Sequence, residues 1–94
     1  MGIKSFADNV TRAVFAGECP KGFPSELQSA TRRKLGMVHA AHELNDLKAP
    51  PNNKLHPLEK DREGQHAIWV NDKYRICFRW DSGDAHEVEF TDYH

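Results

Sequence analysis

The sequence predicts a small α+β domain in which two N-terminal helices pack on one face of an antiparallel sheet. Three observations lead to this prediction. Apolar residues recur at helical spacing in the first half of the chain, they alternate with polar residues from Leu55 onwards, and Pro50 and Pro51 separate the two patterns. The 94 residues have room for one modest core, so we expect residues 1–94 to form a single domain.

The first half is expected to hold a short opening strand and two helices. The run "IKSF" fits the strand, and "ADNVTRAVFAG" has helical spacing up to Gly17, which favours a helix end. After a connector rich in proline and glycine, Ser25 and Gln28 match the capping-box pattern at the start of a helix. The apolar stripe of this second helix runs from Leu27 to Leu44, with "RRK" on its opposite side.

The second half is expected to form three antiparallel strands. The runs "QHAIWV", "KYRICFRW" and "AHEVEFTD" are separated by "ND" and "DSGD", both of which suit hairpin turns. Because side chains alternate along a strand, each run divides between a face toward the helices and an outer face. The inward set is Ile68, Val70, Ile76, Phe78, Trp80, Val88 and Phe90. The outer set is Ala67, Trp69, Arg75, Cys77, Arg79, Glu87, Glu89, Thr91 and Tyr93.

Composition and charge narrow the class of protein. With 38% hydrophobic and 29% charged residues, and no apolar run near the roughly 18 residues of a membrane span, we expect a cytoplasmic protein without membrane contact. Residues 1–54 hold eight Lys and Arg against five Asp and Glu, whereas residues 55–94 hold five against nine. A phosphate-rich partner would therefore prefer the first half. Cys19 and Cys77 lack CxxC spacing, so reduced thiols are expected.

Two interpretations of the outer face stay open on the residues alone. In the first, the face is a solvated surface where Arg75 and Arg79 pair with the glutamates of the last strand, each pair contributing up to about 1 kcal/mol. In the second, Arg75 holds a phosphate with its planar guanidinium, beside the last two side chains of the sequence, Tyr93 and His94.

A histidine beside an arginine suits the cleavage of RNA. The 2′-OH attacks the adjacent phosphorus while a base takes its proton, an acid protonates the 5′-oxygen, and cations stabilise the added negative charge. His94 suits the acid, because its own α-carboxylate favours the protonated imidazole. In a regular strand Tyr93 would share the face of Arg75 and His94 would point oppositely, so His94 is expected to leave strand geometry, or the site to wrap the end of the sheet.

Weaker signals also have two interpretations each. The run Arg32, Arg33 and Lys34 is either a solvated helix face or an RNA-docking patch. His39 and His42 have the i, i+3 spacing of metal ligands on one helix face, but no third ligand is evident and surface histidines are the simpler interpretation.

Three strand residues, Cys77, Trp69 and Trp80, also have a structural and a functional interpretation each. Cys77 is expected to pack rather than to act as a nucleophile. Trp69 and Trp80 are either packed aromatics or platforms for stacked bases.

Four motifs, "IKSF", "RKL", "PPNNKLHPLEKDREGQHAIWVNDKYRICFRW" and the final "DYH", together resemble the HigB toxins of the RelE superfamily, the plasmid maintenance system killer proteins. The resemblance covers nearly the whole chain. It implies a small RelE-like fold and a bacterial toxin that cuts mRNA in the ribosomal A site without a metal or other cofactor. It also implies a HigA-type helix-turn-helix antitoxin as partner, and contact with operator DNA only through that antitoxin.

By matching positions, the resemblance assigns His94, Tyr93 and Arg75 to the catalytic site. Family members often read "L-K-G-D-R-E-G" where this chain reads "L-E-K-D-R-E-G", which puts Glu59 at the place of the usual active-site lysine. Lys60 would point to the other side of a regular strand.

Two consequences of this departure are open. Either Lys60 or Arg62 replaces the lysine through a bent backbone, Arg62 being also a candidate RNA contact, or the chain is a weaker nuclease.

The leading function is therefore a ribosome-dependent endoribonuclease toxin. A second is a protein that binds antitoxin and acts as co-repressor without cleavage, and a third is a metal-binding module on His39 and His42. A nuclease acting on free RNA is not expected, because the acidic second half repels a polyanion.

Overall fold

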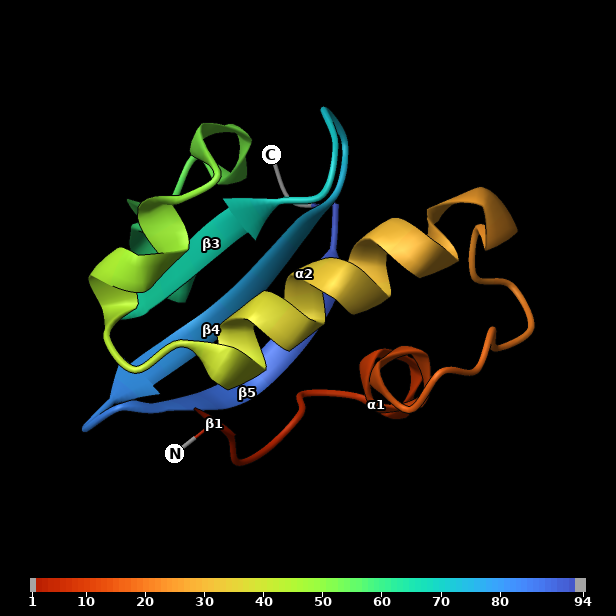
Figure 1. The fold of residues 1–94 in the computed structure, drawn as a ribbon, viewed down its shortest axis with the longest axis horizontal. Helices are drawn as coiled ribbons and strands as arrows, with labels where there is room; N and C mark the ends of the chain where they lie inside the picture. The colour runs from red at the N-terminus through yellow and green to blue at the C-terminus, as the bar shows by residue number, and fades with distance from the viewer. Residues whose placement is uncertain (1, 93–94) are drawn as a thin grey trace.

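Two helices cover one face of a five-stranded sheet in the computed structural model, which describes residues 2–92 (Figure 1). The helices are α1 (Asn9–Phe15) and α2 (Gln28–Ala40). The strands are β1 (Gly2–Ile3), β2 (His56–Pro57), β3 (Gln65–Trp69), β4 (Arg75–Asp81) and β5 (Asp84–Thr91), arranged side by side in the order β1-β5-β4-β3-β2. The α+β class predicted from the sequence is confirmed.

The predicted antiparallel sheet needs one correction. Strands β2 to β5 pair with antiparallel neighbours, but β1 runs parallel to β5, with Ile3 opposite Ala85. The sheet is therefore mixed. Turn signals reveal only strands joined by hairpins, whereas parallel partners need a long connection, which here contains both helices and three strands.

The inward-facing set forms the core together with the helices. Ile68, Ile76, Phe78 and Val88 are fully buried, and Val70, Trp80 and Phe90 pack against them, which confirms the predicted division of faces. The helices contribute Val14, Leu35 and Val38. Burial of each large apolar side chain contributes roughly 1.5–3 kcal/mol, so this layer is the main source of stability.

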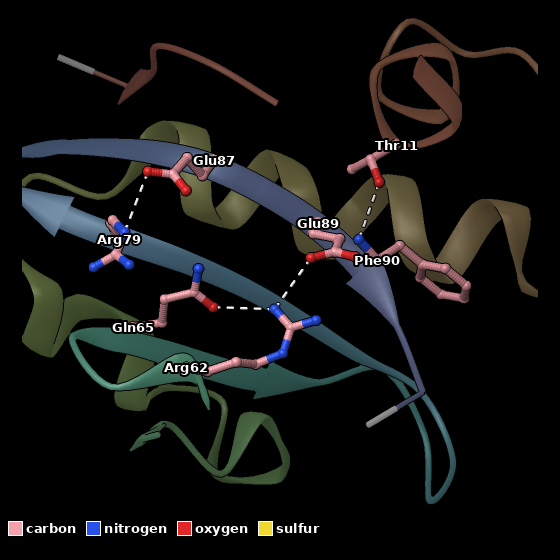
Figure 2. A network of polar contacts seen from close by, with 7 residues as sticks. All are labelled: Thr11, Arg62, Gln65, Arg79, Glu87, Glu89 and Phe90. Atoms are coloured by element: carbon pink, nitrogen blue, oxygen red, sulfur yellow. Dashed lines mark hydrogen bonds and ion pairs between the residues drawn. The ribbon is translucent and has the colours of Figure 1, made fainter. Parts of the chain in front are cut away.

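A buried hydroxyl joins the first helix to the last strand. The backbone N–H of Phe90 donates a hydrogen bond to Oγ1 of Thr11 at 3.0 Å (Figure 2), and Thr11 is fully buried. The ring of Phe90 packs against those of Phe23 and Tyr74, with centroids 4.8 and 4.7 Å away. The position of β5 is therefore set from both its backbone and its side chains.

The second helix differs from its prediction at both ends. A 3₁₀ turn, Ser25–Leu27, precedes α2, no side chain caps either start, and Gln28 instead donates to the carbonyl oxygen of Glu18 at 3.3 Å. The capping-box prediction was wrong because Gln28 is itself the first residue of α2. The helix ends at Ala40, before Leu44, and the following 3₁₀ turn, Leu44–Lys48, has a capping box of Glu43 and Asp46.

A buried asparagine organises the segment that returns from the helices to the sheet. Asn53, at the end of the 3₁₀ turn Pro51–Asn53, donates to the carbonyl oxygens of Leu47 and Ala49 at 3.2 and 3.3 Å. Its Oδ1 accepts a hydrogen bond from Nζ of Lys34. This network fixes the start of the segment that enters β2.

Candidate active site on the outer face of the sheet

Strand pairing aligns outer-face residues in rows across the sheet. One row joins His56 of β2, Ala67 of β3, Cys77 of β4 and Glu89 of β5. Its centre is dry, because Leu58 covers Ala67 and Cys77, both of which are fully buried. Burial raises the pKa of the Cys77 thiol to about 11, which makes it a poor nucleophile. The expectation that Cys77 packs is confirmed.

The neighbouring row joins Trp69, Arg75 and Thr91. The guanidinium carbon of Arg75 lies 3.8 Å from the centroid of the Trp69 ring, and its Nη1 donates to the carbonyl oxygens of Asn71 and Tyr74. Arg75 is only 9% exposed, so aromatic stacking and backbone contacts hold this charge within the sheet. The predicted ion pair of Arg75 with a glutamate of β5 is not among the contacts of residues 2–92.

This row borders the predicted catalytic end of the chain. Thr91, the last residue of β5, is the Cα partner of Arg75, and Asp92 is the last described residue. Tyr93 and His94 lie outside the described residues, so their catalytic roles stay predictions. The structure does place Arg75 beside the strand that leads to them.

Arg62 reaches over the outer face from the segment before β3 (Figure 2). Its Nη1 donates hydrogen bonds to Oε1 of Gln65 and Oε1 of Glu89, each at 3.1 Å. The positive charges of Arg62 and Arg75 both oppose the effect of burial on the pKa of Cys77. Because Arg62 contacts Glu89 and Arg75 stacks on Trp69, the two cations lie over neighbouring rows of the outer face.

The backbone is bent around Glu59, in the run "L-E-K-D-R-E-G" that differs from the family pattern. One of the two hypotheses from the sequence requires such a bend. Residues Lys60–Arg62 form a 3₁₀ turn, and Lys60 has a φ of 58°, in the left-handed region. The regular alternation of side chains between the two faces of a strand therefore cannot be used to place the side chains of this segment. Arg62 is directed over the sheet, whereas Glu59 and Lys60 are exposed. Whether either cation replaces the usual lysine stays a prediction.

The same segment lines an open pocket of about 460 Å³, formed by residues 56 to 62. His56 is the histidine in this lining, and its Nδ1 lies 2.7 Å from the carbonyl oxygen of Lys54. The sequence pattern did not single out His56, because β2 is only two residues long and gives no alternation. Its pairing with β3 is the signal that places it on the outer face.

One predicted cross-strand ion pair is present. Nε of Arg79 lies 3.2 Å from Oε2 of Glu87 (Figure 2), in side chains that are 45% and 57% exposed. A register shift between Cys77 and Arg79, with a φ of 55° at Glu87, brings this glutamate to Arg79. An exposed pair of this kind contributes little stability. The solvated interpretation therefore holds for this end of the face.

The matches to known proteins agree with this architecture. The family model described as the RelE-like toxin of type II toxin–antitoxin system HigB matches residues 4–94. The chain belongs to this HigB-like toxin family. Its relatives include "Endoribonuclease HigB" of Proteus vulgaris, 34% identical over 92 residues and covering 98% of this chain and 99% of the relative. "Toxin HigB-1" of Vibrio cholerae serotype O1 is 40% identical over 62 residues, covering 66% of this chain and 65% of the relative.

The predicted RNA-docking run of this HigB-like chain divides into two parts. Arg32 and Arg33 are exposed and, with Gln28 and Ser29, line a shallow hollow of about 410 Å³. Lys34 is only 4% exposed and binds the side chain of Asn53, so its assignment to a surface patch was wrong. Burial, and to a lesser extent the charge of Arg33, lowers the pKa of Lys34. Lys34 lies beside the buried residue Leu35 on α2, and the long aliphatic part of the lysine side chain reaches inward.

The proposed histidine pair is separated by the end of α2. His39 lies in the last turn, where its Nδ1 accepts a hydrogen bond from the backbone N–H of Ile3 at 3.1 Å, and His42 lies beyond Ala40. The prediction of two imidazoles on one helix face was therefore wrong. No group of three or more His, Cys, Asp or Glu suited to a metal is found within residues 2–92.

The structure shows how the remaining aromatic residues pack and where the two thiols lie. Trp80 packs edge-on against Phe78, with ring centroids 6.4 Å apart, whereas Trp69 is covered by Arg75 and by Lys54. Cys19 is exposed and Cys77 buried, and both are free thiols. Among the described residues no helix has the length and hydropathy needed to cross a membrane.

Proposed function

We propose that this HigB-like protein is a ribosome-dependent endoribonuclease that cuts mRNA in the ribosomal A site and so inhibits translation. Its family membership and its full-length match to a relative named as an endoribonuclease support this. The observation that carries the proposal is the position of Arg75, held by Trp69 and paired with Thr91, directly beside the strand that leads to His94.

The reaction needs only proton transfers and positive charge. The RNA 2′-OH attacks the adjacent phosphorus and gives its proton to water or to a basic group of the ribosome, the bond to the 5′-oxygen breaks, and the products are a 2′,3′-cyclic phosphate and a 5′-OH. We assign the donation of a proton to the leaving oxygen to His94, and a supporting catalytic role to Tyr93. Arg75, and Arg62 or Lys60, stabilise the charge that develops on the phosphate oxygens. Since an acid, a proton acceptor and positive charge can all come from side chains, water and the ribosome, we propose a metal-independent reaction without a cofactor.

The electrostatics of the outer face favour substrate delivery by the ribosome. Arg75 is nearly covered and Arg62 is engaged by Glu89, so neither arginine offers a fully accessible charge to RNA in solution. The ribosome supplies the mRNA already bound and a surface of ribosomal RNA. Arg32 and Arg33, on the opposite layer of the molecule, are the proposed docking contacts.

Membership in a type II family implies an antitoxin partner. We propose a HigA-type antitoxin with a helix-turn-helix domain, which neutralises the toxin in the bacterial cytoplasm. Operator DNA would then be contacted through the antitoxin alone.

Primer extension on a defined message bound to purified ribosomes tests the proposal. We expect cuts from the parent protein, and a loss of roughly 100-fold or more in His94→Ala and Arg75→Ala. Arg79→Ala is the matched arginine control, because Arg79 lies on the same strand and face but pairs with Glu87. Unchanged cutting by His94→Ala and Arg75→Ala would contradict the assigned chemistry.

One observation favours a second function, that of a binding-only co-repressor. Glu59 is exposed at the position where family members often carry the active-site lysine. A parent protein that binds antitoxin but makes no cuts on ribosomes would support this alternative.

A further inference from the structure

We propose that Lys54 is a phosphate-contacting residue of the site, held by Trp69 beside Arg75. The inference deepens the proposed function, on which it rests, by naming a further cation for the RNA phosphate. None of the sequence patterns pointed to Lys54, which sits between the asparagines of the "PPNN" turn and β2.

The sheet register aligns the three side chains. His56 is opposite Ala67 in the antiparallel β2–β3 pair, so Lys54, just before β2, and Trp69, at the end of β3, come together at the same end of this pair. Trp69 is in turn opposite Arg75. Lys54 therefore reaches the indole from the β2 side of the row, and Arg75 from the β4 side.

Both cations are in contact with the same ring. Nζ of Lys54 lies 3.9 Å from the Trp69 ring centroid, and the guanidinium carbon of Arg75 lies 3.8 Å from it. Two charged groups at these distances cannot share one face of an indole without clashing. The ring therefore separates two positive charges that lie within about 8 Å of each other.

The backbone at Lys54 is held in an unusual conformation that directs the side chain to this row. Lys54 has φ 48° and ψ 48°, which places a non-glycine residue in the left-handed region. The preceding Asn53 is fully buried and is bound by Lys34 and by two carbonyl oxygens. Lys54 closes the 3₁₀ turn Pro51–Asn53, where its backbone N–H donates to the carbonyl oxygen of Pro51 at 3.1 Å, so its backbone is held by the turn.

The charge at this row is not neutralised by the described part of the protein. The ion pairs among residues 2–92 join Arg62 to Glu89 and Arg79 to Glu87, and no carboxylate in that range pairs with Lys54 or Arg75. Two like charges held apart by a ring favour an anion that reaches both. A phosphodiester has this capacity, because its oxygens accept from the point charge of a lysine and from the fork of an arginine at once.

Lys54 fits this role better than the cations nearer to Glu59. Arg62 is engaged by Glu89 and Gln65, and Lys60 belongs to a turn outside the row of Arg75. Lys54 is exposed while Arg75 is nearly buried. The lysine therefore makes the accessible contact, and Trp69 is the positioning residue between the two cations.

The test compares Lys54→Gln with Lys73→Gln, a matched control in which a lysine near another ring, that of Tyr74 at 5.3 Å, loses the same charge. Cleavage rates and affinity for mRNA-programmed ribosomes are measured at several salt concentrations. We expect Lys54→Gln to lower kcat/KM and affinity roughly 10-fold and to reduce the slope of log affinity against log salt by about 1. Lys73→Gln should stay within about twofold of the parent, and Lys54→Arg should recover most of the loss.

The positioning role of Trp69 is tested in the same assay. Trp69→Phe, which retains a ring, should keep more activity than Trp69→Leu, and thermal unfolding of each variant separates misfolding from loss of binding. Equal affinity and salt slope for Lys54→Gln and the parent would overturn the inference. A parent that binds programmed ribosomes without cutting them would refute the proposed nuclease, while the salt slope of Lys54→Gln would still decide the role of Lys54.

Discussion

The guanidinium of Arg62 and the carboxylate of Glu89 meet over the outer face of the sheet, with Nη1 and Oε1 3.1 Å apart. Their side chains are 26% and 28% exposed, so the pair is partly shielded from water. It joins the bent segment before β3 to β5, two strands away. One of the few cations near the proposed site is thereby partly neutralised.

Removing the carboxylate of Glu89 should strengthen binding of the protein to mRNA-programmed ribosomes. In Glu89→Gln one negative charge beside Arg62 is removed, so we expect affinity for programmed ribosomes to rise between about 2- and 10-fold at low salt and to return toward parent values at high salt. Glu87→Gln is the matched control, because its partner Arg79 is more exposed and lies further from Arg75 along β4. An equal gain in both variants would mean that only net charge matters.

Replacing Glu59 by lysine should increase cleavage. Glu59→Lys introduces the residue type that the family resemblance implies here, and it changes the local charge by two units in favour of the phosphate. We expect at least a several-fold higher rate of mRNA cutting on ribosomes than for the parent. Glu63→Lys, the same change just beyond the turn, is the control. Cutting that appears only in Glu59→Lys would instead support the binding-only function of the parent.

Lys34 should make stability depend on pH. Burial lowers the pKa of Lys34 in the folded protein from its ordinary 10.5, so between these two values the unfolded chain binds more protons. The free energy of unfolding contributed by this group therefore rises with pH through that window and is lowest below it. In Lys34→Met this rise should be absent, as measured by urea unfolding at several pH values.

The same variant should also be less stable near neutral pH. The side chain of Asn53 loses its donor, which costs roughly 1–3 kcal/mol, partly offset because no charge is buried. Lys48→Met, in the last turn of the segment Leu44–Lys48, is the matched control and should stay within about 0.5 kcal/mol of the parent. Parallel pH curves for the parent and Lys34→Met would contradict the lowered pKa.

The two thiols should differ in reactivity. At pH 8 iodoacetamide should modify the exposed Cys19 within minutes, whereas Cys77, fully buried with its pKa raised to about 11, should react only after unfolding. Mass spectrometry with and without urea measures both sites. A native protein that takes up two labels would show that Leu58 does not close the outer face over Cys77.

Local patterns sufficed where a residue's environment follows from its immediate neighbours. Alternation assigned the strands and their inward faces, and the match of motifs led to the family and to Arg75. Periodicity works at these positions because burial of a whole face dominates over single contacts. It failed for Lys34, whose flexible stem turns a surface position into a buried one, and for the pair of His39 and His42, which the end of α2 separates.

The sequence by itself thus determined the α+β class, the faces of the strands and the family, since each depends on residues close together in the chain. Only the tertiary structure decided which distant residues meet. The parallel pairing of β1 with β5, the contact of Arg62 with Glu89, and the row of Lys54, Trp69 and Arg75 depend on strand register and on the path of a bent loop. These are set by packing over the whole molecule, and no short stretch of sequence encodes them.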